Sequence, residues 1–237
     1  MTAASDASPL SEGSPGSAVR RPGGRTARVR AEVLSAVEAE LVEHGYDALT
    51  IDGVAARSGV HRTTIYRRWK TVDGLLVDLL EAGRDDTWTP ADTGSLRTDL
   101  IALNREVRSA LIGPAPTAAD APAAADAPAP TGSAGEAPVG TSVTTAVIAA
   151  SFRSAAAADA LTRFWEDRYR RSAVVVTRAI DRGELPADTD PDLVLMSATS
   201  PLYHQLLLRR GPLARAEADR WAVAAAEAAT AGAYRRT

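Results

Sequence analysis

The chain has 237 residues, and its 27 Lys or Arg against 30 Asp or Glu leave a formal net charge of −3 at pH 7. This length allows a sizeable core in one or two domains, and the acidic balance excludes a generally basic protein that coats nucleic acid. The absence of cysteine excludes disulfides, thiolate metal sites and thiol nucleophiles, and fits a reducing cytoplasm. No stretch resembles a signal peptide or a membrane span, so we expect a cytoplasmic protein.

Residues 1–24 are predicted to form a disordered tail, because they are rich in Ser, Gly and Pro and poor in large apolar side chains. Arg20, Arg21 and Arg25 could follow the minor groove of DNA, as flexible basic arms do. A solvated tail with incidental charge is an equally good interpretation. A first helix is predicted over Thr26–His44, where apolar residues recur on one face: Val33, Val37 and Leu41.

The segment Thr50–Trp69 has the pattern of two short helices joined by a glycine turn. Thr50 can cap the first of these helices, and Gly59 suits the left-handed position that would end it. In the second helix, Ile65 and Trp69 are four residues apart and form one buried stripe.

The face opposite this stripe is polar and basic. This follows from helical geometry, in which successive residues are about 100° apart. A guanidinium in the first turn of such a helix could fork onto guanine, while hydroxyls reach bases or phosphates. The alternative is a solvated basic helix in an ordinary helical bundle. The cap, the glycine turn, the apolar pair and the basic face together favour DNA binding, for which the candidates are Thr50, Arg62, Thr63, Thr64, Tyr66, Arg67, Arg68 and Lys70.

Charge is distributed unevenly along the chain. From Arg20 to Lys70, ten Arg or Lys stand against six Asp or Glu, a balance of +4, whereas the whole chain carries −3. Any affinity for DNA is therefore predicted to be concentrated in the first third of the chain.

Four short segments occur in a specific order: Gly45-Tyr46-Asp47-Ala48-Leu49-Thr50, Ala55-Ala56-Arg57-Ser58-Gly59-Val60, Thr64-Ile65-Tyr66-Arg67-Arg68-Trp69, and Leu75-Leu76 with Leu79-Leu80. With them, residues 26–82 resemble the N-terminal DNA-binding domain of TetR-family (tetracycline-repressor-like) regulators. The resemblance implies base contacts from Arg62, Thr63 and Thr64. It implies phosphate contacts from Thr50, Tyr66, Arg67 and Arg68.

Two positions depart from the family pattern. His61 stands where Ser or Ala is common, and it is interpreted as a weak cap or a phosphate contact. Val72 stands where a lysine often opens the fourth helix, and Lys70, two residues earlier, is the candidate substitute.

The rest of the chain is predicted to be helical, apart from an Ala/Pro/Asp-rich stretch at about 113–140 that we expect to be a disordered insert. The expected helices are Leu96–Ile112, Thr141–Ser154, Ala156–Arg182, Pro191–Arg210 with a kink at Pro201, and Leu213–Ala233. The predicted fold class is all-α, with a three-helix helix-turn-helix domain over residues 25–70 and a helical regulatory and dimerisation domain over residues 71–237.

The resemblance also implies a homodimer formed through the last two long helices, each subunit enclosing a pocket for a small molecule. Aromatic and soft side chains line most such pockets, although on helices they are more often simple core. The candidates for ligand binding are Phe152, Trp165, Tyr169, Met196, Tyr203 and His204.

The sequence contains no phosphate-binding glycine loop, no histidine pair at metal-ligand spacing and no nucleophile elbow. We therefore expect no catalytic residue, cofactor or metal. The predicted function is a ligand-responsive repressor that binds a palindromic DNA operator as a homodimer. The alternative is a helical small-molecule-binding protein or enzyme whose DNA-binding head is vestigial.

Overall fold

The computed structural model describes residues 23–113 and 142–236, and within these ranges all regular structure is helical. The one sheet-like feature among them is an antiparallel bridge between Thr189 and Arg235. The expected all-α fold is therefore confirmed. The predicted tail apart from its last two residues, and the predicted insert apart from Gly113, lie outside the described residues.

The N-terminal head comprises four helices: α1 (Gly23–His44), α2 (Ile51–Ser58), α3 (Arg62–Trp69) and α4 (Val72–Arg84). Local chemistry sets their ends as expected. The Thr50 hydroxyl accepts a hydrogen bond from the Gly53 backbone N–H at 3.0 Å, and Gly59 ends α2 at φ 68°. Thr71 caps α4 in the same way, through the Gly74 N–H at 3.1 Å.

The head is built around the apolar side of α3. Ile65 is fully buried and Trp69 is 6% exposed, as the four-residue spacing predicts. They belong to one cluster with the apolar face of α1 and the leucines of α4: Val33, Val37, Leu41, Leu75, Leu76, Leu79 and Leu80. Full burial of one such side chain contributes about 1.5–3 kcal/mol, so this cluster holds α3 firmly against the head.

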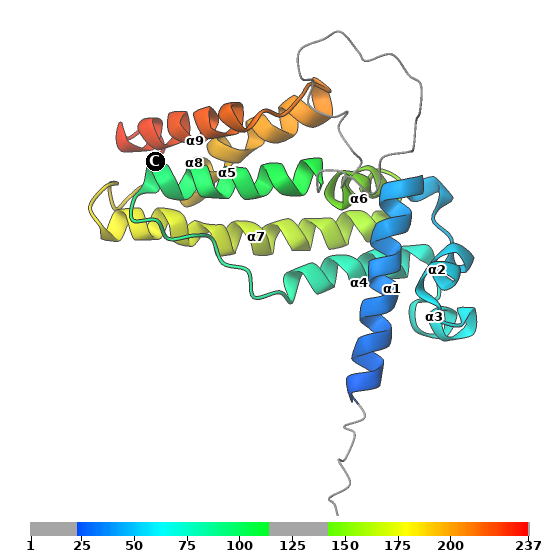
Figure 1. The fold of residues 1–237 in the computed structure, drawn as a ribbon. Helices are drawn as coiled ribbons and strands as arrows, with labels where there is room; N and C mark the ends of the chain where they lie inside the picture. The colour runs from blue at the N-terminus through cyan, green and yellow to red at the C-terminus, as the bar shows by residue number, and fades with distance from the viewer. Residues whose placement is uncertain (1–22, 114–141, 237) are drawn as a thin grey trace, which may run out of the picture.

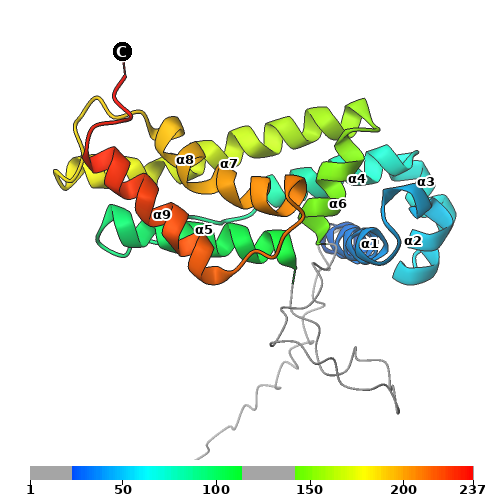
Figure 2. The same cartoon turned by 90° about the horizontal axis from the view of Figure 1, so that it is seen from above.

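The C-terminal body contains α5 (Leu96–Ile112), α6 (Val143–Ser151), α7 (Ala155–Asp181), α8 (Pro191–Tyr203) and α9 (Arg215–Thr230). Figures 1 and 2 show α5, α7, α8 and α9 packed side by side, with the head at one end. The two parts are joined where α4 packs on α7 and α1 packs on α6 (Figure 1).

Several predicted boundaries need correction. Helix α1 begins at Gly23 rather than Thr26, so the last two residues of the predicted tail are helical. Helix α6 is shorter than Thr141–Ser154, because Ser142 caps its start and Ser154 instead caps α7, through the Ala157 N–H at 3.1 Å. Helix α7 is shifted by one residue at each end of the predicted Ala156–Arg182.

The two C-terminal helices are also shorter than predicted. The helix expected over Pro191–Arg210 is α-helical only to Tyr203 and continues as a π-helix over His204–Leu208, shortly after Pro201 removes a backbone donor. The helix expected over Leu213–Ala233 is Arg215–Thr230, because Gly232 turns the chain at φ 82°.

Arginines of α7 hold the connection between α4 and α5 through its main chain. Arg168 donates to the Gly83 carbonyl at 2.9 Å, and Arg171 donates to the Asp86 carbonyl at 2.8 Å and to that of Arg84. Further along α7, Arg178 donates to the carbonyls of Pro90 and Ala91 at 3.4 and 3.3 Å. The end of α4 is thereby tied to the longest described helix of the body.

The carboxylate of Asp78 on α4 connects three helices of the head. It accepts from the Arg30 guanidinium of α1 at 2.7 and 3.0 Å, and from the indole Nε1–H of Trp69 on α3 at 2.7 Å. Burial alone would raise the pKa of the Asp78 carboxyl, but the hydrogen bonds from Arg30 and Trp69 outweigh it, and the pKa is lowered.

We expect Asp78→Asn to lower the free energy of unfolding by about 1–3 kcal/mol, because two donors lose an ionised acceptor. A carboxyl with a lowered pKa in the folded state stabilises the fold above its unfolded pKa of about 4, and this contribution is lost as pH falls through the folded value. Thermal melts followed by circular dichroism should therefore separate the two proteins at neutral pH and bring them together in acid. Asp159→Asn, at an exposed position of α7, is the matched control and should change little.

Candidate nucleic-acid interface and internal cavity

His61 is the N-cap of the reading helix α3. The ring Nδ1 of His61 accepts from the Thr63 backbone N–H at 3.4 Å and lies 2.9 Å from the Thr63 hydroxyl. The long backbone contact makes His61 a weak cap, as one of the two interpretations of this residue predicts. The Thr63 side chain is held at the exposed start of α3.

The face of α3 opposite Ile65 and Trp69 is open to solvent. Tyr66 is 62% exposed, which is unusual for an aromatic side chain. The Arg62 side chain is 67% exposed, and its ion pair with Asp52 at 3.3 Å is equally exposed, so it is weak and easily exchanged for another anion. Among the remaining candidates, Thr64 is half-buried and the following are exposed: Thr50, Arg67, Arg68 and Lys70.

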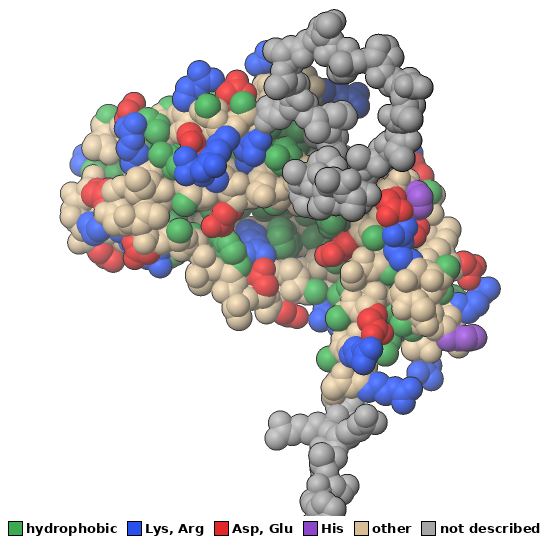
Figure 3. Space-filling model, viewed as in Figure 1, with side chains coloured by type: hydrophobic (Ala, Val, Ile, Leu, Met, Phe, Trp, Pro, Cys, Tyr) green, Lys and Arg blue, Asp and Glu red, His purple; other side chains and the backbone are tan. Residues whose placement is uncertain are grey.

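The outer edge of α3 carries further cationic groups. The Arg68 guanidinium lies over the ring of Trp69 at 4.9 Å, so its stem packs on the anchor while its charge stays near the surface. Arg57 of α2, by contrast, is bound to Glu40 and Glu43 of α1. Figure 3 shows Lys and Arg side chains gathered at the free end of the head.

A tight turn fixes α3 relative to α4. Lys70 has φ 63° and ψ −43°, and across it the Thr71 N–H donates to the Trp69 carbonyl at 2.7 Å. Positive φ is strained for a lysine, and strain of this kind is concentrated at functional sites. A Cβ added to Gly74 would lie 2.2 Å from the Trp69 carbonyl oxygen, so only glycine permits this close approach of α4.

Gly74 and Asp78 are thus positioning residues that sequence patterns did not reveal. Gly74 lies inside a helix, where periodicity says nothing about close contact with a backbone atom. In the sequence pattern, Asp78 is one acidic residue among several on an expected surface helix. Its partner Arg30 is 48 residues away in the chain.

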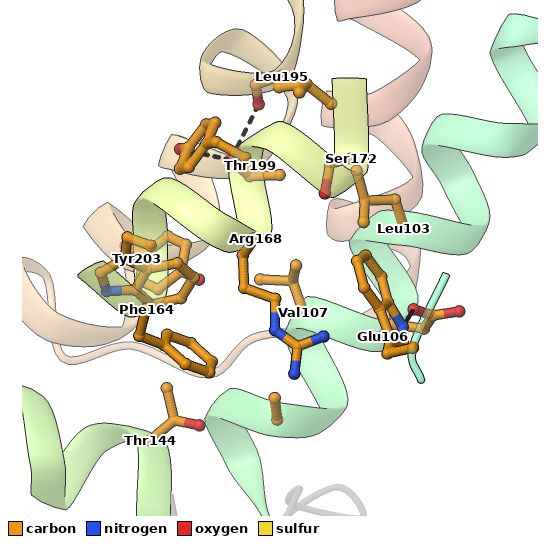
Figure 4. Close-up of a pocket in the computed structure, with 14 residues that line it drawn as sticks. Leu103, Glu106, Val107, Thr144, Phe164, Arg168, Ser172, Leu195, Thr199 and Tyr203 are labelled. Atoms are coloured by element: carbon orange, nitrogen blue, oxygen red, sulfur yellow. Dashed lines mark hydrogen bonds between the residues drawn. The ribbon is translucent and has the colours of Figure 1, made fainter. Parts of the chain in front are cut away.

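A cavity of about 270 Å³ lies among α5, α6, α7 and α8 (Figure 4). Three of the six predicted ligand-binding residues line it, namely Trp165, Tyr169 and Tyr203. Phe164, Arg168 and Trp88 line it as well, although none of them was among the ligand-binding candidates predicted from the sequence.

The structure does not bring the other three predicted residues to this cavity. Phe152 follows the end of α6 and is 85% exposed, because the chain turns there toward α7. His204 is exposed at the start of the π-helix. Met196 is 50% exposed and lines a separate groove between α7 and α8 together with Trp165 and Tyr169.

These features define a class of protein. A short helix held by a buried Ile–Trp pair, with an exposed basic face and a preceding helix joined by a glycine turn, is a helix-turn-helix DNA-binding head. Here it is attached to a helical body that contains a cavity.

Comparison with known proteins identifies the family. Residues 33–79 match the model of bacterial regulatory proteins of the tetR family, and residues 131–225 match that of the tetracyclin repressor-like C-terminal domain. The chain is 32% identical over 176 residues to the DNA-binding transcriptional repressor TetR of Mycobacteroides abscessus, covering 73% of this chain and 78% of that protein. The chain belongs to the TetR family of transcriptional regulators.

A second relative is the HTH-type transcriptional regulator AqdR of Rhodococcus erythropolis, which is 28% identical over 73% of this chain and 72% of its own length. Solved structures share the fold. A TetR transcriptional regulator from Agrobacterium tumefaciens aligns with a TM-score of 0.57 at 20% identity, covering 83% of this chain and 92% of that one. The repressor MexZ of Pseudomonas aeruginosa aligns with 0.54 at 17% identity, covering 89% and 99%.

In the part of the chain that the structure describes, no helix is both long and apolar enough to cross a membrane.

We expect Gly74→Ala to weaken DNA binding roughly tenfold or more, because the added methyl would force α3 away from α4 at the Trp69 carbonyl. Gel shifts with the DNA that flanks the protein's own gene measure this change. Gly24→Ala in α1 is the matched control, since a Cβ there meets nothing within 4 Å. Wild-type affinity for Gly74→Ala would contradict the role given to this turn.

Proposed function

We propose that the protein is a repressor that binds a palindromic operator as a homodimer through α3 and is released by a small-molecule effector. The single observation that carries the DNA contact is the exposed basic face of α3 opposite a buried anchor. Because the proposed target is chromosomal DNA, we place the protein in the cytoplasm.

In this proposal Arg62, Thr63 and Thr64 face base edges in the major groove, since the first turns of a recognition helix enter it most deeply. Arg62 would exchange its exposed partner Asp52 for guanine. The phosphate contacts are assigned to the flanking candidates on α3 and at the caps, which fix register without reading sequence: Thr50, Tyr66, Arg67, Arg68 and Lys70.

We expect Arg62→Ala to weaken operator binding by about 1–3 kcal/mol, because a forked contact to guanine is lost. Tyr66→Phe, which loses only a hydroxyl, should cost about 1 kcal/mol. Gel shifts at several salt concentrations measure both effects, and the wild-type complex should weaken steeply with salt. Arg97→Ala on α5 is the control, since Arg97 is comparably exposed (57%) and, among the residues that the structure describes, pairs with Glu227 alone. Unchanged binding in both head variants would refute the site.

An exposed apolar stripe on α8 and the π-helix supports dimerisation. Leu193, Met196 and Leu207 are 45%, 50% and 36% exposed, and Leu208 is 74% exposed. These four residues belong to one segment of the chain, and exposed large apolar side chains that are concentrated on one element are typical of an interface. A second copy on this face, with α8 and α9 of both subunits in contact, would set two reading helices about 34 Å apart to enter successive major grooves.

Met196→Asp should therefore convert dimers to monomers in sedimentation velocity at micromolar concentration, because a charge is costly at the centre of an apolar interface. Phe152→Asp is the matched control, since Phe152 is also exposed and apolar but lies at the end of α6. The interface assignment fails if Met196→Asp remains dimeric or if Phe152→Asp dissociates.

Contacts between the cavity wall and α4 support release by an effector. Phe164 packs so closely on Gly83 that an added Cβ there would lie 3.0 Å from its ring, and Arg168 holds the Gly83 carbonyl. Asp78, in the middle of α4, holds Trp69 of the reading helix. A molecule in the cavity that favours a different position of Phe164 and Arg168 would shift α4, and with it the spacing of the two heads.

The alternative is a helical small-molecule-binding protein or enzyme with a vestigial head. The gel shift separates the two functions, because a vestigial head would form no discrete, salt-sensitive complex with any genomic fragment. Helix α3 presents an exposed basic face opposite its buried anchor, and this favours the regulator over the protein with a vestigial head.

A further inference from the structure

The cavity described above has a chemical character that restricts what can occupy it. Its volume is about 270 Å³, and its wall combines aromatic rings with two charged side chains and a few hydroxyls (Figure 4). The class of molecule inferred for it rests on the proposed effector role of this cavity.

The aromatic part of the wall presents ring edges and faces at right angles. Phe164 and Trp165 meet at a centroid distance of 5.3 Å with planes 77° apart, and Trp165 and Tyr203 meet at 5.6 Å and 89°. Trp88 closes another side. Edge-to-face arrays of this kind favour a flat aromatic guest, which can stack on one ring while meeting the edge of the next.

The positive charge of the wall is already neutralised. The Nη2 group of Arg168 donates to the Asp86 carboxylate and to the Gly83 carbonyl. Its guanidinium carbon lies 4.8 Å from the ring of Trp88 and 5.1 Å from that of Phe164. An anionic guest would have to compete with Asp86 for this cation.

The negative charge of the wall is held at its edge. Glu106 accepts from the indole Nε1–H of Trp88 at 2.8 Å, which holds its carboxylate at the exposed edge of the cavity (Figure 4). Because this carboxylate lies at the solvent-exposed edge, a cationic guest deeper among the aromatic and aliphatic groups would lack a close anionic partner. Burial of an unpaired charge is strongly unfavourable, so the wall selects against ions of either sign.

One corner of the cavity offers neutral hydrogen-bonding groups. Thr199 donates to the Leu195 carbonyl at 2.9 Å, and its oxygen lies 3.5 Å from the Tyr169 hydroxyl. The Tyr203 hydroxyl, one turn further along α8, has no hydrogen-bond partner among the residues that the structure describes. Burial raises the pKa of Tyr203, so this hydroxyl stays protonated and can donate.

The volume sets the size of the guest. A dry apolar cavity of about 150 Å³ holds one benzene ring, so about 270 Å³ accommodates roughly two fused rings. We propose that the cavity binds an uncharged aromatic molecule of about two fused rings, with one neutral hydroxyl, carbonyl or amide directed at Tyr203 and Thr199.

Three probes of nearly equal shape test this class. They are 2-naphthol, which is neutral at pH 7, 2-naphthoate, which is an anion, and 2-naphthylmethylammonium, which is a cation. Isothermal titration calorimetry of the full chain without DNA should show 2-naphthol binding at least about tenfold more tightly than either ion. Equal or tighter binding of a charged probe, or no binding of 2-naphthol, would overturn the proposal.

Two variants test whether the probes bind in this cavity. Tyr203→Phe keeps the ring and should weaken 2-naphthol several-fold while leaving naphthalene unchanged. Val107→Trp fills the space from α5 and should abolish binding of both. Phe152→Ala, outside the cavity, is the control and should bind like the wild type. If Val107→Trp does not fold, as judged by circular dichroism, the comparison of Tyr203→Phe with naphthalene still decides the polar corner.

The same probe separates this inference from the proposed function. If 2-naphthol binds with the expected selectivity but leaves the gel-shift complex intact, the ligand class holds and release by an effector fails. If the operator complex forms normally but 2-naphthol does not bind, the ligand class fails and the DNA-binding function stands.

Discussion

The orientation of the reading helix depends on one partly buried carboxylate. Asp78 on α4 receives the indole N–H of Trp69 and the guanidinium of Arg30, so a single side chain defines how α1, α3 and α4 meet. The apolar pair Ile65 and Trp69 supplies most of the attraction, but apolar contact has no direction. Hydrogen bonds to Asp78 supply the direction, and the exposed face of α3 points outward as a result.

Features that depend on short-range periodicity could be predicted from the sequence. The buried positions of Ile65 and Trp69, the cap at Thr50 and the left-handed turn at Gly59 all follow from residues within one or two helical turns of each other. Features that depend on distant parts of the chain could not. The link from Arg30 to Asp78 spans 48 residues, and the chain enters a π-helix after Tyr203 although Pro201 indicates only a kink.

The residues of the cavity divide in the same way into features that short-range periodicity predicts and features that it does not. Periodicity places aromatic residues on α7 and α8, but which of them face α5 depends on how the helices are rotated in the bundle. Trp165, Tyr169 and Tyr203 turn inward, whereas Phe152 falls beyond the end of α6 and points into solvent. Arg168 reaches the cavity because Asp86 and the end of α4 hold it there, and no local pattern carries that information.

The arginines of α7 bind main-chain oxygens at the end of α4 and in the connection to α5. One of these oxygens belongs to Pro90, a residue without a backbone N–H. Every residue type carries the same carbonyl, so this part of the anchorage does not depend on side chains, whereas the ion pairs of Asp86 with Arg168 and of Asp92 with Arg178 do. The spacing of these carbonyls along the chain does matter, since each guanidinium binds a carbonyl at a fixed position in the sequence. Residues between α4 and α5 other than Asp86 and Asp92 can therefore change during evolution, whereas an insertion or deletion among them would move every later carbonyl away from its guanidinium.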